Sequence, residues 1–178
     1  MKLSNNIVLI GLKIIAWIIF VGLSIEAGGV IVNFIFSIFK PTVLHLLYQK
    51  LDISIIKQNK PLLFYLLYCF LIAVTVLKSL LFYNVIILLR HLDLQKPFDP
   101  FISKQIMRLS YFTFSIGIIS EIAHHLTTFA IKYGNDVAYL SAYWAEKNAF
   151  ITMSAIIYII AVIFNKGVEL QNENDLTV

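Results

Sequence analysis

Ionisable side chains stand inside long apolar runs of this sequence, where they are the residues best able to do chemistry. Glu26, Lys78 and Glu121 each interrupt such a run, and Glu121 is followed one helical turn later by His124 and His125. Ionisable groups within a membrane mark ion or proton pathways, but polar groups also fix the register of packed helices. Both interpretations stay open here, and we treat the five residues as one buried polar cluster.

The run from Glu121 to His125, E-x-x-H-H, contains residue types that bind metal ions. Positions i, i+3 and i+4 share a helix face, so the three side chains could in principle act together. Carboxylate-bridged dimetal bundles, however, need two E-x-x-H helices and two further carboxylates, and this chain has one such run. It contains no H-E-x-x-H, G-x-S-x-G, P-loop or G-x-G-x-x-G sequence. We therefore predict no metal, no cofactor and no enzymatic activity.

The overall composition indicates whether these residues belong to a soluble or a membrane protein. The chain has 178 residues, 60% hydrophobic and 13% charged, with a mean hydropathy of +0.85. Soluble domains have about 45 to 50% apolar and about 25% charged residues, so a soluble enzyme and a disordered chain are both excluded. The net charge of +4 comes from basic residues at the edges of apolar blocks, which is typical of membrane spans. We predict a lipid bilayer as partner and no direct nucleic-acid binding.

Four apolar segments are long enough to cross the hydrocarbon core, which takes about 20 helical residues. They cover residues 14–39, 62–89, 106–131 and about 140–164. The predicted fold is therefore an all-α integral membrane four-helix bundle, with one transmembrane domain over residues 1–178 and a tail at 165–178. Four crossings place both termini on the same side, and the basic residues favour the cytoplasm for that side by seven to six, with Lys147 counted outside.

Two connections have patterns of their own. Apolar residues recur at helical spacing after Pro41, which predicts an amphipathic interfacial helix between spans 1 and 2: Val43, Leu44, Leu47 and Leu51. Before span 3, Asp99 and Pro100 are the types expected at an N-cap and at the first helical position. The third helix is therefore expected to begin before it enters the lipid.

Small and polar residues fall on one face of each span. The predicted inward stripes are Gly22, Glu26, Gly29 and Asn33; Thr75, Lys78 and Ser79; Ser110, Thr113, Gly117, Glu121, His124 and Thr128; and Ala155 and Tyr158. Such residues let helices approach closely and hydrogen-bond. At about 1.5 Å per residue, Glu26, Lys78 and Glu121 all come near mid-membrane, where an unpaired charge is unfavourable. We predict that Lys78 pairs with Glu26, with Glu121 or with both.

The loop at 90–101 and the tail after span 4 lie on the same side of the predicted topology. The loop presents Pro97 and Phe98 to water, and the tail mixes acidic and apolar residues, which suits contact with a soluble partner. The predicted contact residues in the tail are Leu170, Gln171, Glu173, Asp175 and Leu176.

Pro97-Phe98 before span 3 and the tail at 167–178, written G-x-x-L-Q-x-E-N-D-L-T-V, resemble the bacterial membrane family catalogued as domain of unknown function 2975. The likeness in span order covers nearly the whole chain. Family members commonly have Gly-Asn before Pro-Phe, where this chain has Gln95-Lys96. The resemblance implies a four-helix inner-membrane protein without an assigned activity, often encoded beside a small helix-turn-helix transcriptional regulator.

These observations favour a multi-pass protein of the bacterial inner membrane with cytoplasmic termini. Its expected role is a non-enzymatic regulatory or interaction module that works with the helix-turn-helix regulator. The alternative is a small transporter or channel that uses the buried Glu, Lys and His groups. Because four short helices enclose little water, that alternative requires a homo-oligomer or a proton-sized path.

Overall fold

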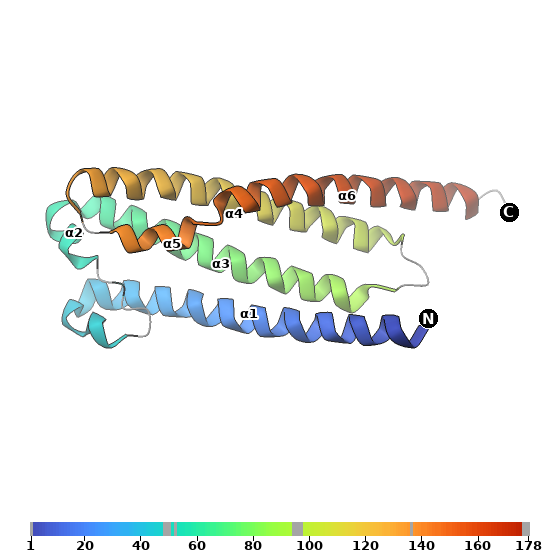
Figure 1. The fold of residues 1–178 in the computed structure, drawn as a ribbon, viewed down its shortest axis with the longest axis horizontal. Helices are drawn as coiled ribbons and strands as arrows, with labels where there is room; N and C mark the ends of the chain where they lie inside the picture. Colours follow the sequence, from blue (N-terminus) through green and yellow to red (C-terminus); the bar gives the residue numbers. More distant parts are fainter. Residues whose placement is uncertain (1, 48–50, 52, 94–97, 136, 176–178) are drawn as a thin grey trace.

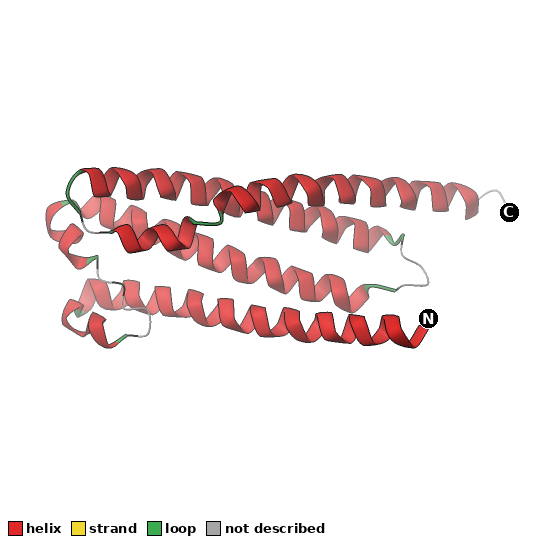
Figure 2. Ribbon diagram, in the orientation of Figure 1, coloured by secondary structure: helices red, strands yellow, loops and turns green. Residues whose placement is uncertain are grey.

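The computed structural model describes residues 2–47, 51, 53–93, 98–135 and 137–175. Four long helical segments lie side by side along one axis (Figure 1): α1 (Lys2–Phe39), α3 (Pro61–His91), α4 (Pro100–Lys132), and a fourth made of α5 (Ser141–Trp144) and α6 (Lys147–Asp175). Short elements lie at one end: η1 (Pro41–Leu46), α2 (Ser54–Asn59) and η2 (Ala138–Leu140). The described residues form no strand (Figure 2). The predicted all-α, four-span architecture is confirmed, since four helical segments are long and apolar enough to cross a membrane.

Both chain ends lie at the same end of the molecule (Figure 1), together with the connection between α3 and α4. We call this the terminal end, and we call the opposite end, with η1, α2 and η2, the loop end. Each helix is longer than the span predicted from hydropathy. At about 1.5 Å per residue, the 33 residues of α4 extend well past the ~30 Å hydrocarbon core. The predicted tail from residue 165 is therefore the helical continuation of α6.

Local sequence signals set the ends of α4. The Asp99 carboxylate accepts hydrogen bonds from the backbone N–H groups of Phe101 and Ile102, at 2.7 and 3.2 Å. This is the predicted N-cap, and it satisfies donors that the first turn leaves unpaired. At the other end Gly134 has a φ of +79°, a left-handed conformation that glycine adopts without steric penalty. The helix thus begins after a residue that caps its first turn and ends before a residue that readily adopts a positive φ.

The helices pack in the order α1, α3, α4, α6. In the described part of the chain, the extensive contacts join α1 to α3, α3 to α4 and α4 to α6. The two middle helices are accordingly the most buried, with 33% and 44% of their most apolar windows covered, against 6% for α1 and 11% for the fourth segment. The outer helices therefore present most of their surface to lipid, and α1 is attached mainly through α3.

The connection predicted as an interfacial amphipathic helix contains two short helical elements, η1 and α2. Its apolar side chains cover the loop end of the core, because Leu51, Ile53 and Ile56 are buried in the same cluster as Phe64 and Tyr68 of α3. The Lys57 ammonium donates to the carbonyl oxygens of Ser37 and Ile38 at 3.4 and 3.1 Å. It thereby satisfies carbonyl groups in the last turn of α1.

Candidate functional site

The fourth helical segment is interrupted inside the bundle. α5 ends at Trp144 and α6 begins at Lys147, with Ala145 and Glu146 between them, and Figure 2 shows the interruption partway along the neighbouring helices. Trp144 is 1% exposed, and its indole N–H donates to the Thr127 hydroxyl of α4 at 3.0 Å. This contact anchors α5, so two charged residues stand at a fixed break in the helix.

One ion pair joins the break to α4. The Lys147 ammonium lies 2.7 Å from Oε2 of Glu121, and Nε2 of His125 lies 3.2 Å from the other oxygen of the same carboxylate. The Lys147 side chain is 17% exposed and that of Glu121 is 34% exposed, whereas His125 is 74% exposed. Glu121 therefore bridges a mostly covered lysine and an outward-facing histidine.

A second ion pair joins the break to α3. The Lys78 ammonium lies 3.4 Å from Oε2 of Glu146 and 5.4 Å from the centre of the Phe150 ring. The Lys78 side chain is 17% exposed, but that of Glu146 is 66% exposed. The lysine is thus held between a carboxylate and an aromatic face, while the carboxylate remains open on its other side.

Both ion pairs lie at the depth of the hydrocarbon core. Lys78 stands 17 residues after the start of α3 and 13 before its end, or about 26 and 20 Å at 1.5 Å per residue. Glu121 lies 11 residues before the end of α4, or about 17 Å. Charges at that depth persist only when they face partners or water, which the observed pairing satisfies.

The predicted partners of Lys78 were wrong. Lys78 pairs with Glu146 instead of Glu26 or Glu121, and Glu121 pairs with Lys147. In the predicted topology Lys147 counted as an outside cation, because span 4 was taken as one helix that enters the membrane near this residue. The observed break instead brings Glu146 and Lys147 level with Lys78 and Glu121, so Lys147 also leaves the count of surface cations.

The remaining members of the predicted cluster are less closely joined. Glu26 is half-buried on α1 and takes no part in the ion pairs found among the described residues. His124 is half-buried, with its ring centre 6.0 Å from that of His125. Among the residues that the structure describes, no group of three His, Cys, Asp or Glu side chains is placed to hold a metal ion.

The predicted polar stripes are partly confirmed. Asn33, Thr75, Ser110 and Thr113 are buried, but other members face outward: Gly22, Thr128, Ala155 and Tyr158. On α6 the inward positions are instead Ser154 and Ala161, at 4% and 0% exposure. The restart of α6 at Lys147 sets its rotation, which the hydropathy pattern of a uniformly apolar segment does not reveal.

Small residues also make direct contacts between neighbouring helices. Ser24 of α1 and Ser79 of α3 share a hydrogen bond of 2.9 Å, and the Ser110 hydroxyl donates to the Ser154 carbonyl oxygen at 3.1 Å. A Cβ atom added to Gly117 of α4 would lie 2.6 Å from Cγ1 of Ile151. These contacts set the distance between the helices that carry the ion pairs.

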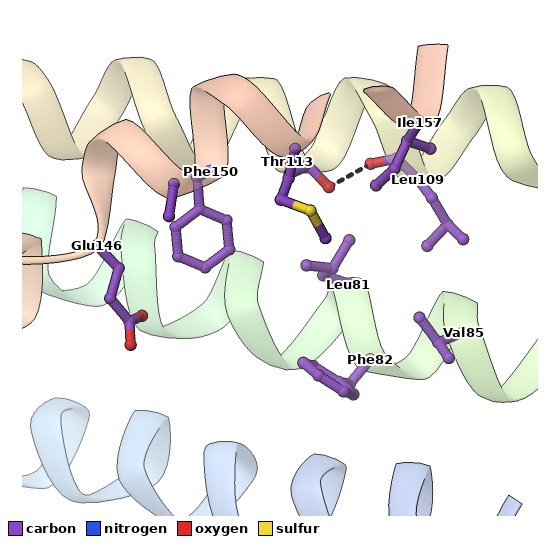
Figure 3. A pocket seen from close by; sticks show the side chains of 10 residues that line it. Leu81, Phe82, Val85, Leu109, Thr113, Glu146, Phe150 and Ile157 are labelled. Carbon is purple, nitrogen blue, oxygen red and sulfur yellow. Dashed lines mark hydrogen bonds between the residues drawn. The ribbon is translucent and has the colours of Figure 1, made fainter. Parts of the chain in front are cut away.

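An apolar cavity of about 430 Å³ opens beside the break (Figure 3). Its lining comes from α3, α4 and the fourth segment: Leu81, Phe82, Val85, Leu109, Thr113, Glu146, Ala149, Phe150, Met153 and Ile157. The Thr113 hydroxyl donates to its own helix, at the Leu109 carbonyl oxygen, over 2.7 Å. In Figure 3 the Glu146 carboxylate points toward α1, so the one charged residue of the lining stands at its edge.

At the terminal end, Phe98 packs on α6 instead of standing free in water. Its ring covers Gly167, where an added Cβ would collide with it, and its centre lies 5.6 Å from that of Phe164. Phe98 is 39% exposed and Leu170 is 65% exposed, while Gln171 is half-buried and Glu173 exposed. Asp175 is the last residue of α6. Pro97 and Leu176 lie outside the described residues.

The chain matches no protein-family model, no curated protein and no solved structure. The resemblance to domain of unknown function 2975 therefore stays a prediction.

Proposed function

We propose that this chain is a non-enzymatic regulatory module of the bacterial inner membrane that binds a soluble partner through its terminal end. The observation that carries the proposal is the packing of Phe98 on Gly167 and Phe164. This contact joins Phe98, which directly precedes the N-cap of α4, to the protruding part of α6, so the start of α4 and the end of α6 form one surface. A surface fixed in this way loses less conformational entropy on binding than two separate flexible segments would.

The chemistry of this surface favours a basic partner. From Lys166 onward, α6 continues for ten residues to Asp175, or about 15 Å. This stretch has one basic residue and three acidic ones, Glu169, Glu173 and Asp175, and it exposes Leu170. An acidic helix with an apolar anchor suits recognition of a helix in a groove. DNA-binding domains carry the required basic face, which agrees with the regulator implied by the family resemblance.

The test is direct binding of a small helix-turn-helix regulator, of the kind that the family resemblance implies, to the protein in nanodiscs. We expect wild type to bind and the variants Phe98→Ala and Leu170→Asp to bind more weakly. Phe129→Ala is the matched control, because Phe129 is 51% exposed near the loop-end terminus of α4. Equal binding by wild type and both terminal-end variants would contradict the proposal.

A second candidate function, binding and transport of a lipophilic cation, is favoured by the cavity beside Glu146. Its ~430 Å³ volume falls in the range of small-molecule sites, about 300 to 1,000 Å³. An apolar lining with the rings of Phe82 and Phe150 and one exposed carboxylate suits a delocalised cation. Lys78 already pairs with that carboxylate, so a ligand would displace the lysine as it enters.

Tetraphenylphosphonium is a suitable probe for this second function. We expect it to bind wild type in proteoliposomes and to bind Glu146→Gln more weakly, with Glu173→Gln as a charge-matched control at the terminal end. Loss of regulator binding in the first test with intact probe binding in this one would select transport over regulation. Probe binding that ignores Glu146→Gln would eliminate the cavity as a cation site.

A further inference from the structure

A basic cavity on α4 is not used by either proposed function. It has a volume of about 370 Å³ and lies over the first three turns of the helix, with a lining of Phe101, Lys104, Gln105, Met107, Arg108 and Tyr111. Lys104 and Arg108 are one turn apart, so they share a helix face, and both are exposed. Among the ion pairs of the described residues, neither cation has a carboxylate partner. The cavity therefore offers two uncompensated positive charges to an anion.

Gln105 gives this cavity a second recognition element. Gln105 is 8% exposed, and its Oε1 atom is buried without a hydrogen-bond partner in the described structure. Buried acceptors are nearly always paired in folded proteins, so turning the Gln105 side chain toward a ligand donor in the cavity that it lines would relieve an unfavourable state. A matching ligand thus combines a negative group for Lys104 and Arg108 with a hydroxyl donor for Gln105.

The depth of the cavity places it among lipid headgroups. The loop end of α4 is marked by Lys132 and by Tyr133, which stacks with the Lys60 ammonium at 4.7 Å, as is usual at an interface. About 20 helical residues cross the hydrocarbon core, so counting back from Lys132 brings the opposite boundary close to Tyr111. Lys104 and Arg108 therefore stand in the headgroup layer of the terminal end.

An apolar groove continues from this cavity toward the membrane interior. It has a volume of about 370 Å³, shares Tyr111 with the basic cavity, and runs between α4 and α6 past Phe114, Ile151 and Ile159. Tyr111 is 60% exposed and Phe114 50% exposed. A molecule with its anionic head on Lys104 and Arg108 can thus lay an acyl chain along this groove. Basic pockets between spans are typical headgroup sites.

We propose that Lys104, Gln105 and Arg108 form a binding site for an anionic phospholipid with a glycerol headgroup, of the phosphatidylglycerol class. The phosphate lies against the two cations, the Gln105 side chain turns toward the cavity so that its Oε1 accepts from a headgroup hydroxyl, and one acyl chain follows the groove past Tyr111. Phosphatidylethanolamine fits less well, because its ammonium brings a positive charge to a site that already holds two.

Native mass spectrometry of the full chain, titrated with phosphatidylglycerol, tests the site. Since a juxtamembrane cation contributes about 1 kcal/mol to binding anionic lipid, or about fivefold in affinity, we expect Lys104→Ala with Arg108→Ala to weaken binding roughly thirtyfold. Lys132→Ala, which removes an exposed cation at the loop end, is the control and should bind as wild type does. Equal affinity of the double variant and wild type, or equal binding of phosphatidylcholine, would overturn the proposal.

Gln105→Met keeps both charges and separates the hydroxyl contact from simple electrostatics. It should weaken phosphatidylglycerol binding but leave phosphatidylmethanol binding unchanged, because phosphatidylmethanol has the same single negative charge and no headgroup hydroxyl. An equal effect on both lipids would refute the assigned contact, and this variant carries the test if the double variant loses its helical circular dichroism. Inorganic phosphate should not displace the lipid. Displacement would assign the site to a free anion and overturn the lipid proposal.

Discussion

Gly117 gives the sharpest test of how α4 and α6 are packed, through the replacement Gly117→Ala. The added Cβ would lie 2.6 Å from Cγ1 of Ile151 and 3.1 Å from its backbone nitrogen. The first contact is relieved only by moving the Ile151 side chain, and the second only by moving the backbone of α6. The substitution therefore acts on the interface that holds the Glu121–Lys147 ion pair.

Two opposing effects set the expected magnitude. Alanine is a better helix former than glycine by about 1 kcal/mol, which favours the variant. Overpacking a filled interface typically costs about 1 to 3 kcal/mol, and contact with backbone places this site toward the upper part of that range. We expect Gly117→Ala to lower the free energy of unfolding by about 1 to 2 kcal/mol.

The assay is equilibrium unfolding in mixed micelles of increasing dodecyl sulfate content, followed by circular dichroism. Gly28→Ala is the matched control, because an added Cβ there meets nothing within 4 Å, and it should be neutral or slightly stabilising. Adding Ile151→Ala to Gly117→Ala removes the side-chain part of the clash, so the two effects should be less than additive. The packing argument is refuted if Gly117→Ala is as stable as Gly28→Ala.

Three further sets of variants test the Glu121–Lys147 ion pair, the anchoring of α5 and the N-cap of α4. Either Glu121→Gln or Lys147→Met alone should destabilise the protein in the same assay, and the double variant should be more stable than either, because a lone charge at this depth is worse than none. Trp144→Phe should lower the unfolding free energy by about 1 kcal/mol through loss of the hydrogen bond to Thr127; an unchanged transition would contradict the anchoring of α5. Asp99→Ala should cost about 1 kcal/mol through loss of the N-cap and should speed amide hydrogen exchange in the first turn of α4, while normal exchange there would count against the cap.

The architecture could be predicted from the sequence because hydropathy depends on composition alone. Four long apolar runs predicted the four helical segments. Because the number of crossings is even, they also predicted that the two termini lie at the same end of the molecule. Asp99 and Pro100 predicted the start of α4 correctly, because N-capping is decided within one turn of the chain. The ends of the other helices were less predictable, since α6 runs to Asp175 through polar residues that hydropathy reads as a tail.

The site was harder to predict than the fold because it depends on helix rotation. Position along each span follows from counting residues, so Lys78 and Glu121 could be placed well inside their helices, as the structure has them. Their partners, however, depend on a break in the fourth segment at Ala145 and Glu146. Neither residue is a proline or a glycine, so the sequence does not predict a break there. If the fourth segment is taken as unbroken, Lys147 is predicted to be a surface cation, and Lys78 is predicted to pair with the wrong carboxylates.

The two ion pairs tie adjacent residues at the start of α6 to different helices, Glu146 to α3 and Lys147 to α4. Any sliding or rotation of α6 against its neighbours must therefore stretch both pairs together. From Lys147, α6 is one continuous helix of 29 residues, about 43 Å long, and it carries Gly167 under the Phe98 ring at the terminal end. A displacement at the break is thus transmitted by a rigid element to the proposed partner surface. One helix thus connects the two ion pairs at the break with the terminal end. A structural role for the ion pairs and a regulatory role for the protein are therefore compatible.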